Sequence, residues 1–296
     1  MTGERQPQVS IVMPSLNQAR FLGAAIDSVL EQDYPRIELI VADGVSTDET
    51  LALLEARART DPRLCWFSAP DTGPAQAVNR ALVRARGILI GWLNADDIYA
   101  PGAVTRAVEA LSGHPEWLMV YGHGEHIDVR GGVLEPYPTL PPETPFDRFR
   151  DGCFLCQPTV FFRRTLWLLL GPLDETLQTA FDFDYWLRAF AQMPERIGFV
   201  DRVQARSRLH ADGITLRQRQ SVMREGMAVL ARHFGTAPPN WVRTYVEELV
   251  DGRVPIAAEV CAKEVALAFL DEVRPLLSPA DYWTLLAQIG SDPRLV

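Results

Sequence analysis

Apolar residues in the first third of the chain form short runs that alternate with stretches of helical spacing. Buried strands are predicted over four of these runs, at residues 9–13, 37–41, 64–67 and 88–93. Helices are predicted between them, over 21–30, 51–58 and 75–85, with Thr47 as the N-cap of the second. Alternating strands and helices imply right-handed crossovers and a mainly parallel sheet.

The pattern changes in the second third of the chain. Short strands are expected at 118–121, 132–134 and 159–162, a proline-rich loop at 136–145 and a helix at 183–190. From residue 216 to the end the apolar spacing is helical, with a break at Pro238 and Pro239. We therefore expect a first domain over 1–215 and a C-terminal helical region over 216–296.

Charge and composition narrow the class of protein. Of 296 residues, 47% are hydrophobic and 23% charged, which is ordinary for a soluble globular protein. The formal net charge of -9 gives no long-range attraction for a polyanion, so nucleic acid is not an expected partner. A bound anionic ligand would need local compensation from a metal, a helix N-terminus or a few basic side chains.

The four cysteines are too few and too scattered for a disulfide framework, and we expect ordinary buried thiols, although Cys153 and Cys156 make a CxxC pair. Residues 1–6 contain no apolar signal core, and no apolar run approaches the roughly 18 residues that would span a membrane. We expect a cytoplasmic protein, which could act peripherally at the inner face of a membrane.

Polar residues follow each of the first four predicted strands. They are Ser15 with Asn17, then Asp43, then Asp71, then Asp96 with Asp97. Because ligands of parallel sheets gather at the carboxyl ends of the strands, these side chains should face one edge. Neither GxGxxG nor GxxxxGK[ST] occurs there, which disfavours a dehydrogenase or a P-loop enzyme. Carboxylates without a phosphate-cradling loop favour a divalent cation that offsets phosphate charge.

Seven short fragments follow in order along residues 8–216: Met13-Pro14-Ser15-Leu16-Asn17, Ala42-Asp43-Gly44 with Ser46 and Asp48, Pro70-Asp71-Thr72-Gly73, Ala77-Val78-Asn79-Arg80, Trp92-Leu93-Asn94-Ala95-Asp96-Asp97, Gln157-Pro158 and Phe181-Asp182-Phe183-Asp184. In this order they resemble family 2 glycosyltransferases of the GT-A fold, above all bacterial enzymes of polysaccharide and glycoconjugate assembly. The resemblance implies an α/β fold with a Rossmann-like, mostly parallel sheet flanked by helices and a C-terminal α-helical appendage. It also implies a nucleotide-binding half at about 8–100 and an acceptor half at about 101–215.

The same resemblance implies a nucleotide-sugar donor, linked through UDP, GDP or dTDP. Asp43 is expected to accept a hydrogen bond from the base. The alternative is a purely structural role, as a turn residue or a helix cap. The other implied donor contacts are Pro14, Ser15, Asn17, Asp71, Asn79 and Asp96.

The fragment from Asn94 to Asp97 resembles the DxD-type motif of the family. Carboxylates are needed there because the sugar diphosphate leaves as an anion, whose charge bound Mn²⁺ or Mg²⁺ can neutralise. Asn94 replaces the commoner acid, so the division of labour between Asp96 and Asp97 stays open. His210 is the further metal contact that the resemblance implies, although Mg²⁺ prefers oxygen ligands.

Asp182 is the expected general base of an inverting transfer, since the family places that acid at the start of a helix. Asp184 lies two positions on and points elsewhere on the helix, so it is expected either on the acceptor side or as a first-turn charge. Gln157 is expected to face the acceptor, which would be a glycan, a lipid-linked molecule or a small molecule. The loop at 136–145 is expected to border that acceptor.

Two other functions are weighed against an inverting glycosyltransferase. A sugar-phosphate nucleotidyltransferase would show a glycine-rich, basic loop where Pro14 to Asn17 stand. A catalytically silent nucleotide-sugar or glycan-binding protein has no need of both the acidic cluster and Asp182. The C-terminal helices could form a homodimer, contact an acceptor carrier or complete the core.

Overall fold

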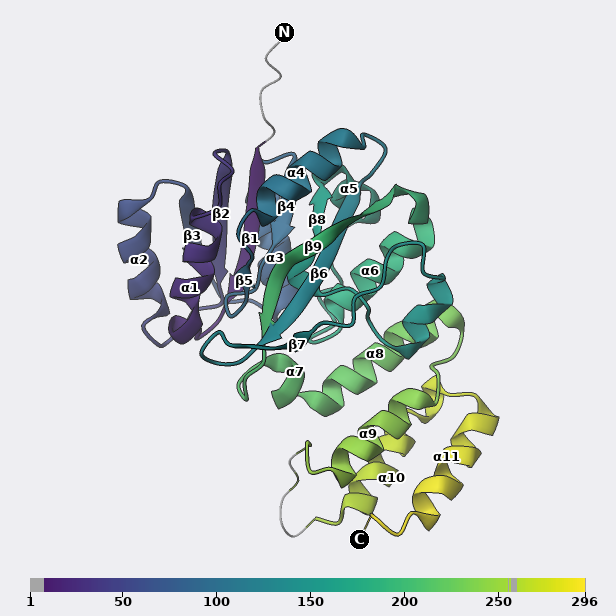
Figure 1. Ribbon diagram of the computed structural model, residues 1–296. Coiled ribbons are helices and arrows are strands. Elements are labelled where there is room, and N and C mark those ends of the chain that lie inside the picture. The colour runs from purple at the N-terminus through teal and green to yellow at the C-terminus, as the bar shows by residue number, and fades with distance from the viewer. Residues whose placement is uncertain (1–7, 255, 257–259, 296) are drawn as a thin grey trace. The chain divides into compact units, whose positions relative to one another are not determined.

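The computed structural model describes residues 8–254, 256 and 260–295 (Figure 1). Its backbone contacts divide the chain into two compact units. The first runs up to Thr144 and continues over Phe154–Thr176 and Arg188–Leu209. The second holds Pro145–Cys153, Leu177–Leu187 and the chain from His210 onward. Each unit is described by itself.

The first unit is built on a sheet of nine strands in the order β3-β2-β1-β4-β8-β6-β9-β5, with β7 paired to β6. The strands are β1 Val9–Ser15, β2 Ile37–Asp43, β3 Leu64–Ser68, β4 Leu89–Trp92, β5 Ile98–Tyr99, β6 Met119–Ile127, β7 Val133–Pro136, β8 Phe161–Arg163 and β9 Ile197–Arg208. Strands β1 to β4 are parallel to one another, and so are β6 and β9. β5, β7 and β8 pair antiparallel with their neighbours.

The parallel strands β1 to β4 are connected by the helices α1 Ala19–Leu30, α2 Thr50–Thr60 and α3 Pro74–Arg84. α4 Ala103–Gly113 lies between β5 and β6, and the short α5 Arg164–Leu170 follows β8. In the view of Figure 1, α1 and α4 lie in front of the sheet and α3 lies behind it. The predicted α/β fold class, with a mainly parallel sheet flanked by helices and helices at the C-terminus, is confirmed.

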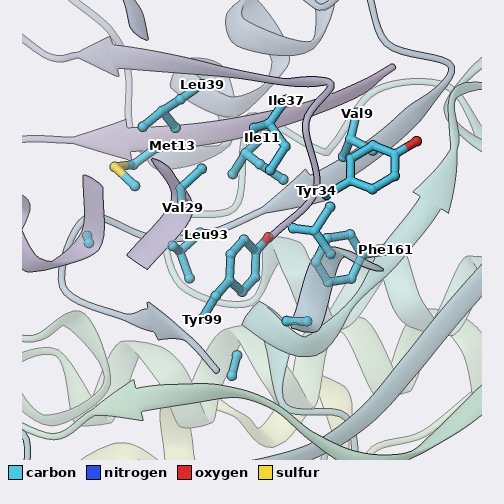
Figure 2. Packing of buried hydrophobic residues seen from close by; sticks show 14 of the residues in the cluster. Val9, Ile11, Met13, Val29, Tyr34, Ile37, Leu39, Leu93, Tyr99 and Phe161 are labelled. Atoms are coloured by element: carbon cyan, nitrogen blue, oxygen red, sulfur yellow. The ribbon is translucent and has the colours of Figure 1, made fainter. Parts of the chain in front are cut away.

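The core of this unit lies between the sheet and the helices α1 and α4. Alternate residues of β1, Val9, Ile11 and Met13, point into it and pack with apolar residues of both helices. Figure 2 shows the rings of Tyr99 and Phe161 beside these side chains, stacked with centroids 5.2 Å apart. This packing fixes β1, β4 and β5, the strands whose ends carry most of the predicted site.

The cysteines are free thiols, but only Cys156 is buried as predicted, whereas Cys65 is exposed and Cys153 and Cys261 are half-buried.

Two predictions of local structure are also wrong. Thr47 does not cap a helix: α2 begins at Thr50 after Glu49, and the backbone N–H of Thr47 donates to Oδ1 of Asn17 instead. The strand expected at 159–162 starts later, because a 3₁₀ turn over Gln157–Thr159 precedes β8. In both places a side-chain or turn hydrogen bond competes with the regular element.

The second unit is helical. It contains the 3₁₀ turns Phe146–Asp151 and Arg274–Leu276, the first turns of α6 Phe181–Gln192, and the helices α7 Ile214–Arg217, α8 Arg219–Phe234, α9 Asn240–Val250, α10 Ala262–Glu272 and α11 Pro279–Ser291. The predicted break at Pro238 and Pro239 is confirmed, since it separates α8 from α9. Apolar residues of α8 to α11 form a core of their own, with the rings of Tyr245 and Phe269 4.3 Å apart. Pairing of two copies through these helices stays a prediction.

None of the helices in the part of the chain that the structure describes combines the length and the apolar character needed to cross a membrane.

Candidate active site

The register of the sheet brings the ends of the first three strands together. Ser15 at the end of β1 lies opposite Asp43 on β2, and Asp43 lies opposite Ser68 on β3. The end of β4 lies on the other side of β1, where Val12 pairs with Trp92. The predicted alignment of polar residues at one edge of the sheet is therefore present in the first unit.

Asp43 is buried, and its carboxylate is held by the loop that follows β2. Oδ2 accepts from the backbone N–H groups of Val45 at 2.9 Å and Ser46 at 3.0 Å, and from the hydroxyl of Ser68 at 2.6 Å. The Ser46 hydroxyl donates to Oδ1. These bonds hold Val45 at φ 67°, a left-handed conformation that is unfavourable for a β-branched residue. Asp43 thus organises the loop, and only Oδ1 has capacity for the predicted contact with a base.

Asn17 ties the loop after β1 to the loop after β2. Its backbone N–H donates to the Ser46 hydroxyl at 2.8 Å, and its Oδ1 accepts from the N–H of Thr47 at 2.8 Å. Asp48 adds a third tie by accepting from the N–H of Ala19 at 3.0 Å. These hydrogen bonds join the two loops into one surface, which is called the wall below. The residues predicted to contact the donor, Pro14, Ser15 and Asn17, belong to it. The hydroxyl of Ser15 is buried and bonds to no other described residue.

Asp71 approaches the same wall from the end of β3. A Cβ atom on Gly44 would lie 2.9 Å from Oδ2 of Asp71, so only glycine allows this approach. Burial raises the pKa of Asp71 and the Asp43 charge adds to the effect, while the N–H of Gly73 and the charge of Arg80 lower it. A half-buried carboxylate at this edge is consistent with the donor contact predicted for it.

Asn79 on α3 is engaged by the segment after α5. Its Nδ2 donates to the carbonyl of Leu173 at 3.0 Å and to Glu175 at 2.9 Å, and its Oδ1 accepts from the N–H of Leu173 at 3.0 Å. Three of the four hydrogen bonds that an asparagine amide can make are thus internal. The structure gives Asn79 the role of holding this segment, and its donor contact stays a prediction.

The two acids after β4 have different surroundings. Asp97 is buried, its Oδ1 accepts from the N–H of Arg208 at 2.8 Å, and Asn94 Nδ2 lies 3.5 Å from its Oδ2. Burial raises the pKa of Asp97 well above its usual range, and the neighbouring Asp96 charge raises it further. The side chain of Asp96 is only half-buried. Asp96 is therefore the better placed of the two for a ligand, a distinction that the sequence left open.

Arg208, the last residue of β9, was missed by sequence reasoning. Besides the bond to Asp97, its Nε donates to the carbonyl of Asp96 and its Nη1 to that of Asp128, both at 2.8 Å. Its guanidinium lies over the ring of Phe21, 4.9 Å from the centroid. The acidic loop is thus fixed by a residue far along the chain. Nothing in the local sequence signals this contact, because it depends on the pairing of β5 with β9.

The carboxylates at this edge suit a divalent cation that is coordinated partly by the protein and partly by a bound phosphate ligand. No group of three or more His, Cys, Asp or Glu side chains suited to a metal exists among the described residues. Mg²⁺ and similar ions are commonly bound by one or two carboxylates together with phosphate oxygens of the substrate. Asp96, with Asp97 behind it, supplies that chemistry.

Gln157 lies against the end of β4. Its Nε2 donates to the carbonyl of Trp92 at 2.9 Å, and the indole of Trp92 donates to Oδ1 of Asn94 at 3.1 Å. Its Oε1 is buried and meets no hydrogen-bond donor in the described part of the chain. A hydrogen-bond acceptor atom is therefore available beside the acidic loop, and the place of Gln157 on the side of the acceptor substrate stays a prediction.

The candidate base lies in the second unit, in the first turn of α6. Burial raises the pKa of Asp182 to about 6, although the N–H of Phe183, 2.7 Å from Oδ1, partly offsets this effect. Asp184 is buried and pairs with Arg232 of α8 at 3.2 Å, with His233 at 3.9 Å. The ion pair gives Asp184 a structural role, and the roles of Asp184 on the acceptor side and of Asp182 as the base stay predictions.

His210 begins the last part of the second unit. It is buried, and its carbonyl accepts from the N–H of Gly213 at 3.0 Å. A Cβ atom on Gly213 would lie 3.4 Å from Nε2 of His210. Its role as a metal ligand stays a prediction.

The mostly parallel sheet flanked by helices, with oxygen-bearing side chains at the ends of its parallel strands, is similar to the fold of GT-A glycosyltransferases. The family model described as glycosyl transferase family 2 matches residues 10–168, more than half of the chain. The chain belongs to glycosyl transferase family 2.

Relatives and solved structures agree with this family. An uncharacterized glycosyltransferase of Rickettsia prowazekii is 30% identical over 219 residues, which cover 69% of this chain and 65% of that protein. The structure of Staphylococcus aureus TarS residues 1–349 matches with a TM-score of 0.61 at 19% identity, covering 97% of this chain and 93% of that one. A Pyrobaculum calidifontis mannosyltransferase, solved with GDP-Man and Mn²⁺, matches with a TM-score of 0.59 at 22% identity, over 97% and 86% of the two chains. At these identities the structures support the fold.

Proposed function

We propose that this chain transfers a sugar from a nucleoside-diphosphate sugar to an acceptor hydroxyl, with inversion at the anomeric carbon. In this reaction the acceptor oxygen forms a bond to the anomeric carbon as the bond to the diphosphate breaks. The hydroxyl proton passes to Asp182, and the nucleoside diphosphate departs as an anion. The observation that carries the proposal is the combination of oxygen-rich strand ends in the family 2 fold with an aspartate whose pKa is raised to about 6.

The donor is assigned to the edge formed by the first four strands. The wall around Ser15 and Asp43 would hold the nucleoside, with Asp71 beside it. UDP-GlcNAc is bound in one TarS structure and GDP-Man in the mannosyltransferase, and these donors define the classes to test first.

A divalent cation would be held by Asp96, with Asp97 and His210 as the further proposed ligands. Bound Mn²⁺ or Mg²⁺ supplies charge neutralisation to the departing diphosphate. The chain's own contribution is positional, since Arg208 and Asn94 fix the loop that carries both acids. The complex of the mannosyltransferase with Mn²⁺ supports this choice of cofactor.

Asp182 would act as general base because burial raises its pKa to about 6. A carboxyl with a pKa of about 6 is ionised at neutral pH and is a stronger proton acceptor than an ordinary aspartate. Gln157 and the loop at 136–145 are proposed on the acceptor side, where a glycan, a lipid-linked molecule or a small molecule would bind.

The base assignment is tested by Asp182→Asn in the full chain. The variant is expected to bind nucleotide and Mn²⁺ as the wild type does and to lose transfer to acceptor or water by at least about 100-fold, since a general base contributes 10²–10⁴-fold. Glu248→Gln is the control in the same unit, since it removes a buried carboxylate that binds Arg219 and not α6, and its main effect should be on stability. Full turnover in Asp182→Asn would refute the assignment.

A further inference from the structure

Glu225 of α8 is a buried carboxylate that accepts hydrogen bonds from the three residues before α6. The N–H of Gln178 lies 3.1 and 3.0 Å from its two oxygens. Its Oε2 also accepts from the N–H and hydroxyl of Thr179, at 2.7 and 2.8 Å, and from the N–H of Ala180 at 3.1 Å. α6 begins at the next residue, Phe181.

Through these bonds, a residue from a distant part of the chain holds the segment that leads into α6. Ala180 flanks the helix, since its carbonyl accepts from the N–H of Asp184 at 2.9 Å, and a carboxylate near the N-terminal end of a helix is favourable. Such a cap usually comes from a residue within the same turn. Here 45 to 47 residues separate the carboxylate from the groups that it holds. The position of the first turn of α6 therefore depends on α8.

A second contact between α6 and α8 involves a residue that follows Asp182 in the sequence. Arg232 pairs with Asp184 at 3.2 Å. Glu225 and Arg232 are seven residues apart on α8, a spacing that places them on the same face of the helix. Asp182 stands in the sequence between the segment held by Glu225 and the acid held by Arg232. Both contacts act on the turn that carries the proposed base.

We propose that Glu225 is a positioning residue for the transfer reaction, holding Asp182 by capping the segment that leads into α6. The inference rests on the function proposed above and deepens it. It gives the C-terminal helices a part in catalysis, because α8 supplies the cap. Asp182 remains the group that takes the proton, and Glu225 acts only through it.

A purely structural role for Glu225 is the rival explanation, and Glu248 offers a matched control. Glu248 on α9 is equally buried, and it accepts from Arg219 Nε at 2.6 Å and Nη2 at 2.7 Å. It lies in the same unit and bonds α8 to α9 rather than α8 to the start of α6. Removing either carboxylate charge should lower stability, but only the replacement of Glu225 should change the pKa of the Asp182 carboxyl.

The test compares Glu225→Gln with Glu248→Gln in the full chain. The readout is the pKa of the Asp182 carboxyl, followed by ¹³C NMR with aspartate labelling and assigned by the signal that Asp182→Asn removes. Both variants should melt below the wild type. In Glu225→Gln the Asp182 pKa should fall from about 6 to about 5 or below, because water gains access to the loosened turn. In Glu248→Gln it should stay unchanged.

Turnover gives the second readout, with UDP-GlcNAc and GDP-mannose hydrolysed in the presence of Mn²⁺. Glu225→Gln should lower kcat at least about 10-fold with little change in KM, since small misplacements of a catalytic group cost up to 10²-fold. If Glu225→Gln does not fold, Thr179→Val removes one of the hydrogen bonds and should move the pKa in the same direction by less.

The outcomes separate the two proposals. An unchanged Asp182 pKa and kcat in a folded Glu225→Gln variant would overturn the positioning role, whatever Asp182→Asn does. Full turnover in Asp182→Asn would instead overturn the base assignment. The NMR titration would still report whether Glu225 fixes that turn.

Discussion

The backbone N–H of Arg208 donates to Oδ1 of Asp97 at 2.8 Å, although 111 residues separate the two in the chain. The contact joins the end of β9 to the acidic loop after β4, next to the pairing of β5 with β9. It gives Asp97 a structural role at the centre of the predicted metal site. Asp96, half-buried beside it, is consequently the carboxylate to test for metal binding.

Replacing Asp97 should therefore affect stability. Asp97→Ala leaves the N–H of Arg208 without its acceptor, which should lower the free energy of unfolding by about 1–3 kcal/mol. Asp97→Asn keeps an acceptor oxygen of the same shape and should cost less. Urea denaturation of both variants measures the difference. Equal losses in the two variants would show that this hydrogen bond is not what Asp97 contributes.

The pH dependence of turnover should follow Asp182. Its pKa is raised to about 6, so the carboxyl is protonated at pH 5 and ionised at pH 7.5. A base must be ionised to accept a proton, and kcat is therefore expected to fall about 10-fold for each pH unit well below 6. Initial rates at saturating donor between pH 4.5 and 8 check this. A kcat that is flat across that range would contradict the assignment, provided that donor binding is intact at each pH.

Asn79→Ala should destabilise the first unit, because it breaks three hydrogen bonds to the segment at 173–175. The expected loss is about 2–3 kcal/mol in the free energy of unfolding. Gln76→Ala is the control, since Gln76 lies on the same helix and its two side-chain hydrogen bonds, with Glu175 and with the N–H of Thr72, are exposed. Nucleotide affinity measured at low temperature separates the two roles of Asn79. A weaker affinity without a loss of stability would favour the donor contact.

Gly44→Ala should disturb the loops that are proposed to hold the nucleoside. The added Cβ atom would lie 2.9 Å from Oδ2 of Asp71, so the carboxylate must move. We expect a loss of about 1–3 kcal/mol in stability and weaker nucleotide binding. Gly113→Ala is the control, because a Cβ atom there meets nothing within 4 Å. Calorimetric titration with UDP and GDP measures the effect, and an unchanged affinity in Gly44→Ala would argue against a nucleoside at this wall.

Local patterns in the sequence were sufficient to predict β1 to β4 and the helices α1 to α3, whereas β5 and α4 were missed. Buried runs such as 9–13 and 37–41 match β1 and β2 because each is flanked by turn residues and followed by a helical pattern. The 12-residue strand β9 was missed. Charged and polar residues interrupt its apolar positions, and its burial alternates irregularly, so the period-2 signal is weak.

In the site, too, features set by the local sequence could be predicted, and features set by residues far along the chain could not. The strand-end acids could be found from the sequence, because each follows a recognisable strand. The contacts that distinguish Asp96 from Asp97 and Asp182 from Asp184 could not, since they come from Arg208 and Arg232 far along the chain. Glu225 was likewise invisible as a cap, because its role depends on the packing of α8.

Metal-dependent binding of a nucleoside diphosphate is the decisive test of the proposed donor site. UDP and GDP would each be titrated into the wild type and Asp96→Asn by calorimetry, with and without Mn²⁺. We predict that at least one nucleotide binds the wild type with Mn²⁺ and that binding weakens at least about 10-fold without the metal. Asp96→Asn should lose this metal dependence while it stays folded. Binding of neither nucleotide, or equal Mn²⁺-dependent binding by Asp96→Asn, would contradict the proposed donor site.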